Sequence, residues 1–189
     1  MRLICGLGNP GPEHAKDRHN AGFLVVEHLA ARLGAKLDSV KFDGRLGVAE
    51  AGKQKLLLLL PLTYMNLSGQ CVAAAVRFYK LTAAQLLVVH DELDFTFGRL
   101  QLKEGGGTAG HNGLRSIVAS LGEDGFARLR VGVGKPEGKQ QTVGHVLSGF
   151  NKQERAALPE LLERAADAAF GWATLPFAEA MNRFNRRGP

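Results

Sequence analysis

Cysteine is scarce in this chain, since only Cys5 and Cys71 occur among 189 residues. Both lie in apolar stretches, and neither belongs to a Cys-x-x-Cys pair or to a Cys/His spacing typical of metal sites. This predicts two buried, reduced thiols rather than a disulfide framework. Long apolar runs are also missing: none approaches the roughly 20 residues that cross a bilayer, and no signal segment opens the sequence. We therefore expect a soluble, cytoplasmic protein without membrane association.

Several motifs of enzyme chemistry are absent as well. No Gly-x-Ser-x-Gly elbow supplies a nucleophile, and neither cysteine has the basic surroundings that activate a thiolate. The glycine-rich stretch 105–110 lacks the Gly-Lys-Ser/Thr end of a P-loop. Two interpretations of this stretch remain: a flexible connection, or a lid over a cleft. No His-x-x-x-His pattern supports a metal site. Metal binding remains the rival interpretation for four residues: His19, His90, Asp91 and His111.

The length and composition that are present fit one globular domain spanning residues 1–189. A hydrophobic content of 45% is enough for a sizeable core, and no repeat or linker marks a second domain. The formal net charge of +6 favours a polyanionic partner only weakly, because many small basic proteins bind no nucleic acid.

Apolar patterning predicts an alternation of strands and helices. Strands are expected at 3–7, 40–51, 55–60, 86–90, 98–103 and 127–133, and helices at 22–33, 69–79, 114–121 and 152–172, with Pro159 kinking or restarting the fourth helix. Pro176 is expected in the first turn of a last helix that ends in a basic tail of Arg183, Arg186 and Arg187. This order predicts a single-domain three-layer α/β/α sandwich around a mixed, mostly parallel twisted sheet.

Two further patterns refine this prediction. The continuous leucine run 56–60 indicates a strand buried on both faces. Capping signals are predicted at Ser68, at Thr82-x-x-Gln85 for a single helical turn and at Asn151-x-x-Glu154 for the long helix.

A histidine and an aspartate stand where ligands gather in α/β domains. His19 lies between the Pro/Gly-rich exit of the first strand and the first helix, and Asp91 follows the apolar strand 86–90. A hydrogen bond from His19 to Asp91 would fix the imidazole tautomer and raise its basicity, which suits a general base. The position alone is equally compatible with a structural or solvated histidine.

Asparagines accompany this pair on other loops at strand ends. Asn9, Asn66 and Asn112 each fit a simple turn former, but together they could hold peptide groups or a developing oxyanion. A His/Asp pair without a nucleophile points to activation of water, and an ester yields more readily than an amide because its alkoxide is the better leaving group.

Five motifs in register resemble bacterial peptidyl-tRNA hydrolases across nearly the whole chain. They are Gly6-Leu7-Gly8-Asn9-Pro10-Gly11, Arg18-His19-Asn20-Ala21-Gly22, Pro61-x-Thr63-Tyr64-Met65-Asn66-x-Ser68-Gly69, His90-Asp91-Glu92-Leu93-Asp94 and Gly110-His111-Asn112-Gly113-Leu114. The resemblance implies a monomeric cytosolic enzyme with no cofactor and no obligate protein partner. It implies hydrolysis of the ester between a peptide and the terminal ribose of tRNA, which recycles tRNA from peptidyl-tRNA released by ribosomes.

The resemblance also implies roles for single residues. His19 matches the catalytic base and Asp91 the carboxylate that orients it. The resemblance assigns substrate binding to five residues: Asn9, His14, Met65, Asn66 and Asn112. It assigns the contacts with a tRNA phosphate, the phosphate clamp, to Lys103 and Arg130. The departures are His14 and Asp17, where many members carry Tyr and Thr, and Leu60, where a Lys often precedes the proline.

Two other classes of function stay open at this point. A non-RNA esterase or amidase would cleave small peptide esters with little dependence on salt. A catalytically silent RNA-binding module would bind tRNA tightly, in a salt-sensitive way, without turnover.

Overall fold

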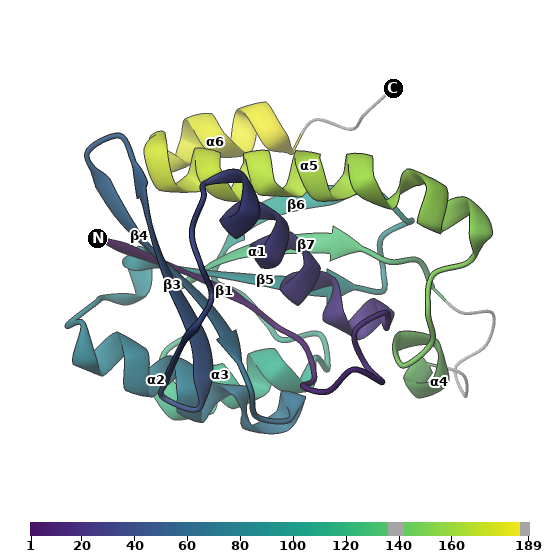
Figure 1. Cartoon of the computed structure of the whole chain (residues 1–189), viewed down its shortest axis with the longest axis horizontal. Helices are drawn as coiled ribbons and strands as arrows, with labels where there is room; N and C mark the ends of the chain where they lie inside the picture. Colours follow the sequence, from purple (N-terminus) through teal and green to yellow (C-terminus); the bar gives the residue numbers. More distant parts are fainter. Residues whose placement is uncertain (136–141, 186–189) are drawn as a thin grey trace.

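The computed structural model describes residues 1–135 and 142–185, and in this part of the chain seven strands form one mixed sheet (Figure 1). Their order is β2-β3-β4-β1-β5-β7-β6. The four strands β4, β1, β5 and β7 run parallel, whereas β2, β3 and β6 pair antiparallel with their neighbours. The strands are β1 (Arg2–Gly6), β2 (Ser39–Lys41), β3 (Gly44–Ala51), β4 (Gln54–Pro61), β5 (Leu86–Glu92), β6 (Leu100–Glu104) and β7 (Ala127–Gly132).

Helices cover both faces of this sheet, which confirms the predicted three-layer sandwich. On one face pack α1 (Ala21–Arg32), α5 (Lys152–Thr174) and α6 (Phe177–Phe184), and on the other α2 (Ser68–Phe78) and α3 (Asn112–Leu121) (Figure 1). The short α4 (Thr142–Val146) contacts η1 (Arg18–Asn20), the 3₁₀ turn just before α1. The described part of the chain also contains the 3₁₀ turns η2 (Met65–Leu67) and η3 (Ala83–Gln85). No described helix is long and apolar enough to cross a membrane.

The leucine run in β4 shows why the central strands are so continuously apolar. Leu56, Leu58 and Leu60 belong to the core beneath α1 and α5, whereas Leu57 and Leu59 belong to the core beneath α2 and α3. All five are fully buried, as predicted for a strand covered on both faces. Cys5 and Cys71 are buried free thiols, again as predicted.

A close approach of backbones fixes where α1 begins. A Cβ on Gly22 would lie 2.3 Å from the carbonyl oxygen of Val89 and 2.4 Å from the amide nitrogen of Leu7. Only glycine fits there, so the first turn of α1 rests directly on the carboxyl ends of β1 and β5. This contact brings η1, which carries His19, to the same edge of the sheet.

Several local predictions were wrong or incomplete. The predicted strand 40–51 is two strands, because Phe42 and Asp43 adopt positive φ values of 58° and 57° and form a tight hairpin turn between β2 and β3. Ser68 is the first residue of α2 rather than its cap, and its hydroxyl donates to the carbonyl of Met65 at 3.0 Å. Pro176 precedes α6 as its N-cap instead of lying in the first turn, and α4 was not predicted.

The long helix α5 does not restart at Pro159. It continues from Lys152 to Thr174, although a proline in a helix interior removes one hydrogen bond and costs about 3 kcal/mol. Its buried face, including Leu161, Ala165 and Trp172, packs on the sheet and offsets that loss. Both predicted capping boxes are present, at Thr82/Gln85 and at Asn151/Glu154. Arg186 and Arg187 of the predicted basic tail lie outside the described residues.

Candidate active site

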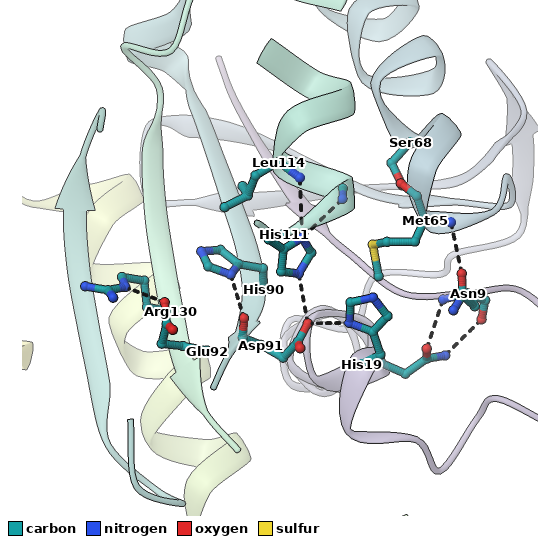
Figure 2. Close-up of polar contacts among 12 residues, drawn as sticks. Asn9, His19, Met65, Ser68, His90, Asp91, Glu92, His111, Leu114 and Arg130 are labelled. Carbon is teal, nitrogen blue, oxygen red and sulfur yellow. Dashed lines mark hydrogen bonds and ion pairs between the residues drawn. The ribbon is translucent and has the colours of Figure 1, made fainter. Parts of the chain in front are cut away.

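His19 and Asp91 meet at the carboxyl end of the central strands. The His19 Nδ1 atom lies 2.8 Å from Oδ1 of Asp91, which is almost wholly buried in β5 (Figure 2). Because the carboxylate accepts the Nδ1 proton, the neutral ring keeps its lone pair on Nε2. The His19 side chain is 13% exposed, so a water molecule can approach it.

A second imidazole binds the same carboxylate oxygen. His111 Nε2 lies 2.9 Å from Oδ1 of Asp91, and His111 Nδ1 accepts the backbone N–H of Gly113 at 3.1 Å (Figure 2). The latter contact makes His111 the N-cap of α3 and leaves the ring proton on Nε2, where it is donated to Asp91. From the sequence, His111 was a candidate only as a rival metal ligand and had no role in the predicted catalytic site. The helix was predicted to begin at Leu114, whereas α3 begins at Asn112, directly after His111.

These contacts set the charge of the cluster. Burial raises the pKa of Asp91, but the neighbouring His111 and His19 outweigh it and hold the pKa of this carboxyl well below its usual range. Burial and the proximity of His111 lower the pKa of His90 to about 3. The His90 ring stands edge-on to His111 at 5.0 Å between centroids. At neutral pH the cluster therefore contains an ionised Asp91 and an uncharged His90.

The donor set does not fit a metal ion. His19, Asp91 and His111 place three possible ligand atoms within 4.8 Å of one another. A metal-bound histidine normally donates its other ring N–H to a neighbour. His111 does the reverse, because its Nδ1 accepts backbone N–H groups and its Nε2 carries the proton.

Asn9 and Met65 lie on the other side of His19 from Asp91 (Figure 2). The Asn9 side-chain oxygen accepts the backbone N–H of Met65 at 2.9 Å. Asn20 exchanges two hydrogen bonds with the Asn9 backbone, each 2.9 Å long. Asn9 therefore ties the loop after β1 to η2.

The other predicted binding residues are arranged differently. Asn66 is exposed in η2, and Asn112 is exposed at the first position of α3 with its side-chain oxygen accepting from Arg115 at 2.8 Å. His14 points back to Asp17, with 2.8 Å between Nδ1 and Oδ2. Two of the three residues named above as departures, His14 and Asp17, thus bind each other.

A cavity of about 770 Å³ opens beside the His/Asp pair. His19, Asp91, Asn112, Lys103 and Arg130 line it together with the glycine-rich loop and residues of α4, whereas Asn9, His14, Met65 and Asn66 do not. The predicted site is therefore split: the phosphate-clamp residues and Asn112 share the cavity, and the remaining binding residues lie beyond it.

The two predicted clamp residues differ in their charge environment. Arg130 Nε donates to Glu92 at 2.9 Å, and its guanidinium lies 4.2 Å from the centroid of the Phe95 ring. Lys103 is exposed in β6, directly opposite Arg128 of β7. Arg130 is thus largely neutralised by an acid, and Lys103 presents its charge to solvent.

A histidine oriented by a buried carboxylate at the mouth of a cavity is an arrangement that hydrolytic enzymes use to activate water. The comparisons with known proteins agree and are more specific. The chain belongs to the peptidyl-tRNA hydrolase family, because the family model described as "Peptidyl-tRNA hydrolase" matches residues 3–189. This confirms the resemblance carried by the five motifs.

Individual relatives cover nearly the whole chain. A peptidyl-tRNA hydrolase of Geobacillus thermodenitrificans is 43% identical over 185 residues, which is 98% of this chain and all of the relative. One of Geobacter metallireducens is 50% identical over 166 residues, 88% of this chain and 85% of the relative. The crystal structure of peptidyl-tRNA hydrolase from Acinetobacter baumannii superposes with a TM-score of 0.92 at 42% identity, covering 98% of this chain and 94% of that one.

Proposed function

We propose that His19 is the general base in the reaction for which the family is named, the hydrolysis of the ester between a peptide and the terminal ribose of tRNA. The observation that carries this proposal is the 2.8 Å contact between His19 Nδ1 and Asp91 Oδ1, which directs the lone pair of Nε2 outward. A water molecule bound there loses its proton to His19 as it attacks the ester carbonyl. The bond between the carbonyl carbon and the ribose oxygen then breaks, and the leaving alkoxide takes up the proton that His19 had accepted from water.

Asp91 orients His19 and stabilises the imidazolium that forms during this step. Its ionised state is supported by the lowered pKa of its carboxyl group. His111 acts through Asp91 as a positioning residue, because it holds the same carboxylate oxygen from the start of α3.

Asn112 is our choice for the donor to the oxyanion. Sequence reasoning left Asn112 and Asn66 open. Asn112 lines the cavity with His19, and its bond to Arg115 fixes the side-chain oxygen so that the NH₂ group is free to donate. Asn9, Met65 and Asn66, beyond His19, would then bind the peptide, and His14 would add a surface at the entrance.

In this proposal the end of the tRNA that carries the peptide ester binds in the cavity beside His19. Lys103 and Arg130 line this cavity and suit contacts with phosphate. The formal net charge of +6 favours such a polyanion. We also infer from the family resemblance that residues 1–189 act as one monomeric domain in the cytoplasm, without a cofactor or an obligate protein partner.

Single-turnover release of tRNA from a short N-acylated aminoacyl-tRNA tests the proposal. His19→Ala should lower the rate roughly 10²- to 10⁴-fold, the usual loss for a general base. His28→Ala, which removes a partly exposed histidine from α1, is the matched control and should keep the wild-type rate. EDTA should change neither rate.

The same assay separates the alternatives. A His19→Ala variant with most of the wild-type rate would sink the general-base role. Tight tRNA binding by the wild type without any turnover would leave a binding module. Equal turnover of small peptide esters and peptidyl-tRNA, with little salt dependence, would indicate a general esterase.

A further inference from the structure

Arg128 is a buried cation in the wall of the cavity with most of its donors unused. It lies in β7, is 2% exposed and lines the cavity beside His19. Its Nη1 donates to the carbonyl of Gly107 at 2.6 Å. Its Nε and Nη2 atoms have no hydrogen-bond partner among the residues that the structure describes.

This arrangement is costly for the folded protein. An unpaired ion in a protein interior loses several kcal/mol of hydration free energy, and burial indeed lowers the pKa of Arg128. The guanidinium lies 5.0 Å from the centroid of the Phe126 ring, a contact worth about 1–2 kcal/mol, so it offsets only part of that loss. Arg130, two residues along the same strand, has Glu92 as a partner. Within the described ranges Arg128 has no such ion pair, and the charge of Asp124 raises its pKa by less than burial lowers it.

A second orphaned group lies in the same wall. His90 Nδ1 donates to the backbone carbonyl of Asp91 at 2.8 Å, which leaves Nε2 as an acceptor, and this atom is buried without a partner in the described chain. Arg128 is close enough that its positive charge helps to lower the pKa of His90. One cavity thus holds unused donors on Arg128 and an unused acceptor on His90, a combination that points to a missing polar ligand.

The glycine-rich loop covers Arg128 through a single carbonyl group. Its ends are tied down, because Gly105 donates to Phe126 at 3.1 Å and His111 donates to Thr108 at 2.8 Å. Gly106, with a φ of +98°, passes over Lys103: a Cβ there would lie 2.7 Å from the Lys103 ammonium. The Gly107 carbonyl therefore presents an oxygen to a basic surface, in the place where an anion would present one.

We propose that Arg128 is an anion-binding residue of this cavity, and that an oxygen of a phosphate group takes the place of the Gly107 carbonyl when ligand binds. The proposal rests on the proposed function, in which the phosphates near the end of tRNA enter this side of the site. Lys103, opposite Arg128 on β6, is the second cation for the same group. Because the covering loop leads straight into His111, phosphate binding at Arg128 is linked to the carboxylate that orients His19.

Two substrates that share the ester and differ in phosphate test this proposal. They are an N-acetyl-aminoacyl adenosine, which has none, and the corresponding N-acetyl-aminoacyl-tRNA. Arg128→Gln should lower kcat/KM for the tRNA ester about tenfold more than for the adenosine ester, and should reduce the salt-dependence slope by about 1. Arg164→Gln, an exposed arginine of α5, is the matched control and should affect both substrates alike.

The outcomes separate the two proposals. If the wild type cleaves neither ester, the proposed function fails. If the wild type cleaves both and Arg128→Gln lowers both to the same extent, the reaction stands and the anion-binding role of Arg128 is overturned. Arg128→Lys, which keeps the charge, should recover part of the loss on the tRNA ester.

A measurement on the wild-type protein keeps the test independent of how the variants fold. The Nε–H resonance of Arg128 can be followed by NMR during titration with adenosine 5′-monophosphate, inorganic phosphate or adenosine. A shift with the monophosphate but not with adenosine supports the proposal, and the phosphate titration shows whether free phosphate suffices. No shift with either phosphate-bearing ligand contradicts it.

Discussion

Asp91 is the residue on which the chemistry of this site converges. One of its oxygens accepts hydrogen bonds from His19 and His111, and its backbone carbonyl accepts a third from His90. A buried carboxylate with two imidazole donors stays ionised, and it holds both rings in single tautomers. Three histidines from three parts of the chain are thereby ordered around a single negative charge.

Asp91→Asn should therefore lower kcat far more than it changes KM. The amide oxygen can still accept one hydrogen bond, but it lacks the charge that stabilises an imidazolium at His19. We expect kcat to fall roughly 10²- to 10⁴-fold, measured by single turnover on a peptidyl-tRNA substrate. Asp167→Asn removes an exposed carboxylate of α5 and serves as the control. A near-normal kcat for Asp91→Asn would refute the orienting role.

The sequence identified His19 and Asp91 because both stand at strand ends, which is a local signal. It could not identify the hydrogen bond of His111 to Asp91, since that contact joins strand β5 to the N-cap of α3, 20 residues further along the chain, and depends on how α3 docks. Arg128 was even less visible, because its strand reads as an ordinary alternation and its lack of partners is a property of the packed interior. Local sequence patterns therefore predict His19 and Asp91, whereas the contacts of His111 and Arg128 depend on tertiary packing.

Among the helices and turns, η1 is held in place from outside its own sequence. Arg18, just before His19, pairs with Glu154 at 2.6 Å and donates to Ser148 and Gly149. Its backbone N–H also donates to the carbonyl of Ser148 at 3.0 Å. Glu154 in turn closes the capping box of α5. The segment that carries His19 is therefore anchored to the beginning of the longest helix.

Glu154→Gln should destabilise the fold and weaken catalysis together. Arg18 would be left as a buried charge without a counter-ion, which costs about 3 kcal/mol in the free energy of unfolding. Urea denaturation measures this loss, and the single-turnover rate should fall because η1 loosens. Glu163→Gln, in the same helix, removes the carboxylate of an exposed ion-pair network and should leave both quantities nearly unchanged. Equal stability of the two variants would refute the buried-pair argument.

Helices and strands are predictable from the sequence where their apolar pattern is strong. Strands and helices with a clear apolar period, such as 86–90 and 22–33, are confirmed as β5 and α1. The wrong predictions fell where one or two residues decide the outcome: the positive φ values at Phe42 and Asp43, the cap at Ser68 and the tolerance of Pro159 in α5. Such points depend on backbone conformation and packing that periodicity does not encode.

For the whole molecule, the sheet edge that forms the site is also where its buried polar groups gather. The side chains of His90, Asp91, Glu92 and Arg128 are all buried in β5 and β7, next to core clusters of apolar residues. These buried polar groups lower the stability of the fold at the carboxyl ends of β5 and β7, where the site needs them for its chemistry. Stability should consequently depend on the protonation of these groups.

His90 makes the sign of this dependence predictable. In the folded protein its pKa is lowered to about 3, whereas the unfolded chain takes up the proton below about pH 6.5. Between these values the unfolded state binds more protons, so the free energy of unfolding falls as the pH falls, by about 1.4 kcal/mol per pH unit from this group. Asp91, whose pKa is lowered, adds no change until the pH reaches the ordinary carboxyl range near 4.

His90→Asn isolates that contribution. Asparagine can still donate to the Asp91 carbonyl but does not titrate, so the variant should lose less stability than the wild type between pH 6.5 and 5. Urea unfolding of both proteins from pH 8 to 5 measures the difference, which should be constant above about pH 7.5 and change in favour of the variant below it. Parallel curves over the whole range would mean that His90 takes up its proton over the same pH range in the folded protein as in the unfolded chain, which would contradict the lowered pKa of the buried imidazole.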